Sequence, residues 1–250
     1  MSHEAVIVAA VVLLLFVALF LVFLSRVRAG HIPKFRKIPA FDSLNGMASQ
    51  AIETGRPLHL SLGIGGMTNA STADSLAGLA VLDHMAQRAA ITGVHPTVSM
   101  ANPTVMLFAQ NRLRAPHGND SRGAEDAYRS VRWQAPQPAA YAAGVMSLLS
   151  TDQVHANVMV GKFGDEYLLM GEAAAQRGIA QVGGASDPNT LPFVYTTAQE
   201  VLLGEEIYAA GAYLQKHPAH VSSLLTQDTM RWGVALAMLA GVVLASLGWW

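Results

Sequence analysis

The stretch His59-Leu60-Ser61-Leu62-Gly63-Ile64-Gly65-Gly66 is a short apolar run that ends in a glycine-rich turn. Such a run, bounded by turn residues, predicts a strand. Ser71, with Asp74 three residues later, predicts the start of a helix. The apolar residues of this helix recur at helical spacing: Leu76, Leu79, Ala80, Leu82 and Met85. A strand, a glycine turn and a helix in this order are typical of an α/β domain.

The same alternation continues along the central part of the chain. Strands are predicted at residues 97–100, 130–134, 155–160 and 179–182. Helices are predicted at residues 103–113, 138–149, 165–177 and about 197–214, with another from about 219. The polar residues 115–128 predict the longest connection. Alternating elements of this length predict a parallel sheet that is covered by helices, with right-handed crossovers.

Two pairs of short segments in this domain resemble each other. Residues 86–88 and 175–177 both read Ala-Gln-Arg, and each precedes a predicted strand. Residues 102–104, Asn-Pro-Thr, are similar to residues 187–190, Asp-Pro-Asn-Thr. Two interpretations stay open: a duplicated strand-helix-strand-helix unit, and chance similarity in an alanine-rich sequence.

The N-terminal segment predicts a membrane anchor. Residues 5–24 are twenty consecutive apolar residues, which give about 30 Å of helix, the thickness of a hydrocarbon core. A cleaved signal peptide would have a basic start and a shorter apolar stretch. Five basic residues and no acidic residue follow the run: Arg26, Arg28, Lys34, Arg36 and Lys37. By the positive-inside rule this flank is cytoplasmic, and a basic patch for anionic lipid headgroups would lie on the same side.

The C-terminal segment predicts a second span. Residues 232–250 carry no charge, with Trp232 at one end and Trp249-Trp250 at the other, as in interfacial aromatic belts. This span starts on the side where the first one ends, so both termini are expected outside the cytoplasm. Four small residues recur every fourth position and favour close helix packing: Gly233, Ala237, Gly241 and Ala245. The alternative is that they reflect only the abundance of Gly and Ala.

Composition excludes several classes of protein. Hydrophobic residues make up 52% of the 250 residues and charged residues 13%, whereas about 25% is usual in soluble domains, so an ordinary soluble enzyme is excluded. The net charge of -1 leaves no basic surface for nucleic acid. The absence of cysteine excludes disulfides, thiolate metal sites and cysteine nucleophiles.

Five stretches carry a resemblance to a known family. They read HLSLGxGG at residues 59–66, SLAGL at 75–79, APxPxAYAAG at 135–144, ANVMxGxFG at 156–164 and GEExYAAG at 204–211. With them the chain resembles a bacterial membrane-protein family catalogued as domain of unknown function 6754. The resemblance covers nearly the whole chain, including both spans. It implies the two-span topology and supplies no activity and no site residues.

Known catalytic and cofactor motifs are incomplete. In a dinucleotide-binding turn the third glycine would fall at Thr68, and no acidic residue follows the strand that ends at Met100, so no cofactor is expected. Phe163 follows Gly161-Lys162, which excludes a P-loop. No histidine pair has the spacing of a helical zinc motif, so no metal is expected, and no G-x-S-x-G turn indicates a hydrolase.

A ligand, if the domain binds one, would lie at the carboxyl ends of the parallel strands. The residues predicted there are Gly63, Gly65, Gly66, Thr68, Asn69, Asn102, Lys162, Gly183, Gly184, Ser186 and Asp187. Backbone N–H groups, short polar side chains and one cation would suit a small anionic or phosphorylated ligand. The alternative is that tight turns require these residue types with no ligand at all.

We therefore expect a span at residues 1–25, a basic linker at 26–42, a Rossmann-like α/β domain with a parallel sheet at 43–228, and a second span at 229–250. The expected function is that of a non-enzymatic scaffold subunit in the bacterial inner membrane, with the central domain in the cytoplasm. Its expected partners are the lipid bilayer and copies of itself or related subunits, and no nucleic acid. The alternative is a ligand-binding or enzymatic domain that uses the glycine-rich turns.

Overall fold

The computed structural model describes residues 3–31 and 33–246. The chain divides into two compact units. One unit comprises Met1–Phe35 together with Lys216–Trp250, and the other comprises Arg36–Gln215. The second unit is the α/β domain.

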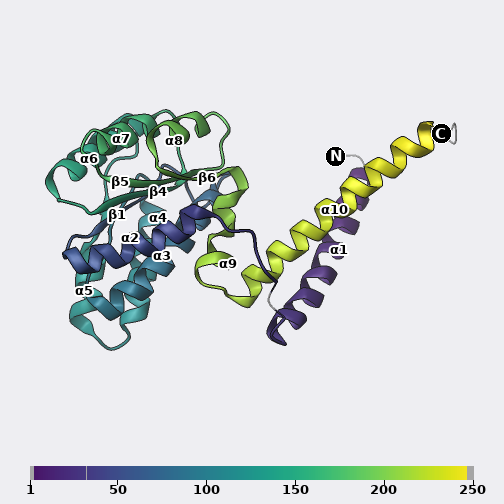
Figure 1. Cartoon of the computed structure of the whole chain (residues 1–250), viewed down its shortest axis with the longest axis horizontal. Helices are drawn as coiled ribbons and strands as arrows, with labels where there is room; N and C mark the ends of the chain where they lie inside the picture. The colour runs from purple at the N-terminus through teal and green to yellow at the C-terminus, as the bar shows by residue number, and fades with distance from the viewer. Residues whose placement is uncertain (1–2, 32, 247–250) are drawn as a thin grey trace. The chain divides into compact units, whose positions relative to one another are not determined.

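The first unit is a pair of long helices, α1 (His3–Arg28) and α10 (Pro218–Ser246), which lie side by side (Figure 1). Both are long and apolar enough to cross a membrane, and 18-residue windows within them have mean hydropathies of 3.5 and 1.5. The helix α10 runs without a break from Pro218, so the second predicted span shares one helix with the more polar residues before it. Trp249 and Trp250 lie outside the described residues.

The α/β domain contains one six-stranded sheet. All of its strand pairs are parallel, as the alternating pattern predicts, and the strand order is β3-β2-β1-β4-β5-β6. The strands are β1 (Leu58–Gly63), β2 (Thr97–Met100), β3 (Val131–Trp133), β4 (Ala156–Lys162), β5 (Ala180–Ala185) and β6 (Glu200–Leu203). This order is that of doubly wound dinucleotide-binding folds, which confirms the Rossmann-like prediction.

Helices cover both faces of the sheet. On one face lie α2 (Pro39–Thr54), α3 (Thr72–Thr92), α4 (Pro103–Arg114) and α5 (Ser121–Arg129), and on the other lie α6 (Pro138–Thr151), α7 (Glu166–Ala175) and α8 (Leu191–Thr197) (Figure 1). The helix α3 approaches β4 closely, because a Cβ added at Gly78 would lie 2.5 Å from the Val160 carbonyl oxygen. A glycine inside this helix is therefore a packing requirement.

The sheet has two halves of three strands each. The repeated Ala-Gln-Arg segments precede β2 and β5, which are the second strands of the two halves. The similar Asn-Pro and Asp-Pro segments follow the same two strands. The short sequence similarities thus fall at equivalent places in the two halves.

Two sequence predictions about the elements are wrong. The expected connection at residues 115–128 contains the 3-10 helix η1 (Ala115–His117) and most of α5. The expected helix at 197–214 is instead the edge strand β6, the 3-10 helix η2 (Gly204–Ala209) and α9 (Ala210–Leu214). A helix cannot continue through Gly204, whose φ is 60°, and pairing with β5 draws residues 200–203 into the sheet.

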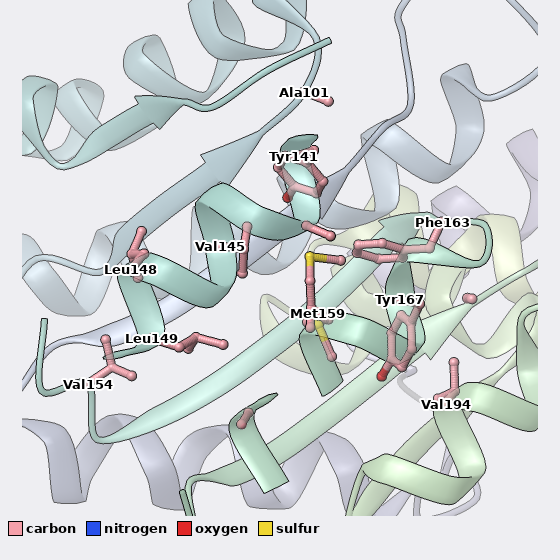
Figure 2. Close-up of a cluster of buried hydrophobic side chains, with 14 residues drawn as sticks. Ala101, Tyr141, Val145, Leu148, Leu149, Val154, Met159, Phe163, Tyr167 and Val194 are labelled. Atoms are coloured by element: carbon pink, nitrogen blue, oxygen red, sulfur yellow. The ribbon is translucent and has the colours of Figure 1, made fainter. Parts of the chain in front are cut away.

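An apolar core lies between the sheet and the helices α6, α7 and α8. Figure 2 shows Val145 and Leu149 of α6 lying over the sheet near Met159 of β4. Phe163 and Tyr167 pack edge to face there, with ring centroids 5.3 Å apart. These buried side chains fix α6 and α7 on the sheet and so position the turns at the ends of β1 and β4.

Candidate functional site

The strands β1 and β4 are neighbours at the centre of the sheet, where the strand order reverses. The chain leaves β1 toward α3 on one face and leaves β4 toward α7 on the other (Figure 1). In doubly wound folds a crevice opens at this point, outside the carboxyl ends of the strands. The structure brings the predicted turns together here: Gly63 and Gly65 approach Lys162, and Gly66 approaches Asn102.

The glycine-rich turn after β1 is filled by side chains of its own surroundings. A Cβ at Gly65 would lie 2.5 Å from the Ser75 Oγ, and one at Gly66 would lie 3.1 Å from amide nitrogens of both Asn69 and Asn102. The Gly66 N–H donates to the Ser71 Oγ at 2.9 Å. Serine and asparagine side chains thus fill the space beside these two glycines.

A carboxylate of the chain itself lies at the N-terminus of α3. Asp74 lies in its first turn, is buried, and accepts hydrogen bonds from the hydroxyls of Ser186 at 2.7 Å and Tyr208 at 2.6 Å. Burial and the bond to Asp74 raise the pKa of Tyr208. A carboxylate at this position opposes the binding of an anion to the helix terminus.

The predicted cation of the site, Lys162, is neutralised. Its Nζ lies 2.5 Å from an Asp187 carboxylate oxygen. The bond from Lys162 and the Asn189 backbone N–H lower the pKa of Asp187. The lysine is therefore engaged by a partner in the neighbouring turn, which weakens the expectation of an anionic ligand.

Two predicted turn glycines lie inside a strand. Gly183 and Gly184 belong to β5, which continues to Ala185 instead of ending at Val182. A Cβ at Gly183 would lie 2.0 Å from the Tyr167 hydroxyl, and one at Gly184 would lie 3.0 Å from Leu202 and Ile207 side-chain atoms. Both glycines are explained by the close approach of neighbouring elements, not by a ligand turn.

The remaining predicted residues have local roles or lie at the surface. Asn102 caps α4, because its Oδ1 accepts the N–H groups of Thr104 at 2.9 Å and Val105 at 3.4 Å. The Asn69 Oδ1 accepts from the N–H and hydroxyl of Ser71. Thr68 is exposed on the turn. Most of the predicted residues thus stabilise the crevice edge itself.

An open cleft of about 670 Å³ lies beside these turns. It is lined by Ile64, Pro138, Ala139, Gly164, Asp165, Glu166, Leu169, Asp187, Asn189 and Thr190. Of the three carboxylates in this lining, Asp187 is paired with Lys162, and Asp165 and Glu166 give the cleft its negative charge. Glu166 is buried and accepts the Gly164 N–H at 2.8 Å, which holds its carboxylate at the start of α7. The cleft therefore favours a ligand with a cationic or hydrogen-donating group over the predicted anion.

A buried row of polar side chains crosses the sheet. The two ring nitrogens of His59 on β1 contact the Asn157 Oδ1 at 2.7 Å and the Ser99 Oγ at 2.9 Å. The Asn157 amide donates to Gln181 at 3.0 Å, and the Gln181 amide donates to backbone carbonyls of Gly171 and Thr197. The row therefore joins β2, β1, β4 and β5 to the helices α7 and α8.

Tyr141 of α6 joins the same network. Its hydroxyl lies 2.6 Å from the Ser61 Oγ and 3.1 Å from the Ser99 Oγ. Burial raises the pKa of Tyr141 to about 12 and lowers that of His59 to about 4, so both groups are neutral at pH 7. Because Asn157 donates to Gln181, its carbonyl oxygen accepts the His59 Nδ1–H, and Ser99 donates to Nε2. We interpret the network as a structural one, because each of these buried groups has a partner.

The chain matches the model of the family described as Domain of unknown function (DUF6754) over residues 2–250. It belongs to this family. No curated protein and no solved structure matches the chain. The DUF6754 family description names no activity, so the function is argued from the residues.

The polar row is the feature of this DUF6754 domain that sequence patterns did not identify. Its histidine, asparagine and glutamine lie on separate strands and become neighbours only through the strand register, which pairs His59 with Asn157 and Asn157 with Gln181. The available signal was a histidine inside an apolar strand. Within the described residues no three His, Asp or Glu side chains are grouped as metal ligands.

Proposed function

We propose that this chain is a doubly membrane-anchored, non-enzymatic structural subunit that assembles with copies of itself or with related subunits. The observation that carries the proposal is the exposed apolar surface of α1 and α10. Leu14 and Met238 are each 69% exposed, and most of the other large apolar side chains of both helices are exposed as well. A continuous apolar surface of this length is unstable in water and is stabilised by a lipid bilayer.

The basic flank of α1 supports a cytoplasmic position for the α/β domain. Arg26 and Arg28 lie in the last turn of α1, and Lys34, Arg36 and Lys37 follow. We propose the inner membrane of a bacterium as the location, with both termini outside the cytoplasm. Arg36 belongs to the α/β unit, where it forms an ion pair with Glu206.

Protease protection is expected to test this sidedness. With the outer envelope permeabilised and the inner membrane closed, added protease is expected to leave residues 36–215 intact. After detergent opens the inner membrane, the same segment is expected to become accessible. Cleavage of the domain in closed cells would overturn the proposed topology.

The small residues of α10 support assembly within the membrane. A Cβ added at Gly233 or Gly241 would have no heavy atom of the described chain within 4 Å. The two glycines are therefore not used in the contact between α1 and α10, and they remain open to another helix. Close helix contact in lipid depends on such small residues, because lipid offers no hydrophobic drive for association.

The variant Gly241→Ile is expected to weaken assembly, because its side chain would separate the helix backbones. Native mass spectrometry of the complex in mild detergent would give the mass of the wild type and of the variant. We expect the wild type to be an oligomer. We expect Gly241→Ile to raise the dissociation constant of this oligomer at least about tenfold, which is about 1.4 kcal/mol. Ala240→Ile adds similar bulk at the neighbouring position and is the matched control. A monomeric wild type, or equal masses for all three proteins, would contradict assembly through this stripe.

A second candidate function is ligand binding in the cleft beside Ile64 and Glu166. The volume of about 670 Å³ and the position at the strand-order reversal favour it. The carboxylates of Asp165 and Glu166 favour a ligand with a cationic or hydrogen-donating group. The same mass measurement distinguishes the two functions, because a monomer that retains a small molecule supports binding and an unliganded oligomer supports assembly.

A further inference from the structure

The cleft at the start of α7 has both an apolar and a charged lining. Its apolar part consists of Ile64, Pro138, Ala139 and Leu169. Leu169 is 49% exposed and lies one helical turn after Glu166, so the two side chains project from the same side of α7. A ligand that fits this lining carries a charged group next to an apolar one.

The carboxylate of Glu166 is buried and only partly paired. The side chain is 5% exposed, and its Oε1 accepts the Gly164 N–H at 2.8 Å. Within residues 3–31 and 33–246 the Oε2 accepts no hydrogen bond and the carboxylate forms no ion pair. Burial of a charge without a cationic partner is costly. The open oxygen of Glu166 therefore provides an acceptor for a cationic donor in the cleft.

Asp165 places a second negative charge beside Glu166. It is exposed at the cleft, and its side chain has no partner in the described part of the chain. Asp187 differs, because Lys162 already neutralises it. A primary ammonium group has three N–H donors and can reach two neighbouring carboxylates at once. This part of the cleft is thus suited to an ammonium group.

A second part of the lining offers positive partial charge. The helix α6 begins at Pro138, and its N-cap residue Gln137 makes no side-chain capping bond. No acidic residue lies in the first turn of α6, whereas α7 begins with Glu166. The first N–H groups of a helix have no partner within the helix, and its N-terminus carries about half a positive charge. Ala139 of this first turn lines the cleft, so the terminus is available to an anionic group there.

We propose that the cleft binds a small amino acid with an apolar side chain. Its ammonium group would bind Glu166 and Asp165, its carboxylate would bind the start of α6, and its side chain would contact Ile64 and Leu169. A simple anion is repelled by the two carboxylates, and a simple cation is repelled by the helix terminus, whereas a zwitterion satisfies both. The proposal rests on the second candidate function and names the class of ligand.

Calorimetric titration of the full-length chain in mild detergent tests the proposal with leucine and two matched compounds. 3-Methylbutylamine lacks only the carboxylate of leucine, and 4-methylpentanoate lacks only its ammonium group. Leucine is expected to bind at least about tenfold more tightly than either compound, because each of them loses one set of charge-assisted hydrogen bonds. Isoleucine, methionine and phenylalanine are titrated in parallel.

Two variants separate the two charged parts of the cleft. Glu166→Gln keeps an acceptor for the Gly164 N–H and removes the charge, and it is expected to weaken leucine binding at least about tenfold. Gln137→Asp places a carboxylate at the α6 N-cap, where such a residue stabilises a helix. It is expected to weaken the binding of leucine and not that of 3-methylbutylamine. Should Glu166→Gln fail to fold, Asp165→Asn and Gln137→Asp still carry the test.

Glu172→Gln is the matched control, because Glu172 is exposed on the same helix and is not part of the cleft lining. This variant is expected to bind leucine as the wild type does. No binding of any of the four amino acids, or equal losses for Glu166→Gln and Glu172→Gln, would overturn the proposal. Equally tight binding of leucine and 3-methylbutylamine would overturn the zwitterion and leave the cleft as a binding site. The oligomer mass, measured separately, reports on assembly alone.

Discussion

Replacing His59 with leucine is expected to lower the free energy of unfolding by about 2–5 kcal/mol. The imidazole bridges Asn157 and Ser99 inside the sheet, with contacts of 2.7 Å and 2.9 Å. Leucine would leave the Asn157 oxygen and the Ser99 hydroxyl buried without this partner, at about 1–3 kcal/mol each. Urea unfolding of the full-length chain in mild detergent, followed by circular dichroism, measures the change.

Two controls separate the network from general effects of substitution. His59→Gln retains a donor and an acceptor and is expected to lose less stability than His59→Leu. His155→Leu removes a half-exposed imidazole that contacts Gln50 at 3.1 Å, and it is expected to change stability by less than about 1 kcal/mol. Equal losses for His59→Leu and His155→Leu would show that the buried row does not stabilise the sheet.

Acid is expected to destabilise the wild type through the same residue. The pKa of His59 is about 4 in the folded chain, because of burial, and about 6.5 in an unfolded one. Between these values the unfolded chain binds a proton that the folded chain does not, so stability falls as the pH falls from 6.5 to 4. The loss from this group is about 3 kcal/mol in total. The difference in stability between wild type and His59→Leu is therefore expected to shrink over this pH range.

Gly183→Ala is expected to destabilise the domain by about 2–3 kcal/mol. The new Cβ would lie 2.0 Å from the Tyr167 hydroxyl, and the buried ring of Tyr167 packs against Phe163, which limits its movement. Overpacking of a tight core typically costs about 1–3 kcal/mol. Urea unfolding in mild detergent is again the measurement.

Tyr167→Phe is expected to rescue much of this loss. The Tyr167 hydroxyl is buried and makes no hydrogen bond within the described residues, although it lies near Thr197, and burial raises its pKa. Removing it is expected to cost less than about 1 kcal/mol alone and to relieve the clash in the double variant. Strict additivity of the two substitutions would contradict the contact.

The α/β class and the parallel sheet follow from local sequence patterns. The strands β1 to β5 were each predicted from a short segment between turn or helix residues, and β1, β2 and β4 are buried along most of their length. Asn102-Pro103 marks the start of α4, because a cap depends only on neighbouring residues. The strand β6 was predicted as part of a helix. Its four residues become a strand only because the edge of β5 is available, which is a tertiary effect.

The position of the candidate site could be predicted from the sequence, whereas the charge of its lining could not. Parallel strands bring their carboxyl ends to one edge, so the turns after β1, β2 and β4 meet as expected. Sequence alone does not show that Lys162 is neutralised by Asp187, or that Asp165 and Glu166 make the cleft acidic. Such pairings depend on side-chain directions that the strand register and the helix positions determine.

The two apolar helices and the elements from β1 to α4 and from α6 to α7 could be predicted from the sequence, because hydrophobic periodicity and segment length are local properties of the chain. The strand order and the buried row through His59 appear only in the folded structure. These features join residues from different elements, and their contacts depend on how the elements pack. At Gly183 the reason for the glycine is visible only in the folded structure, where the Tyr167 side chain leaves no room for a Cβ.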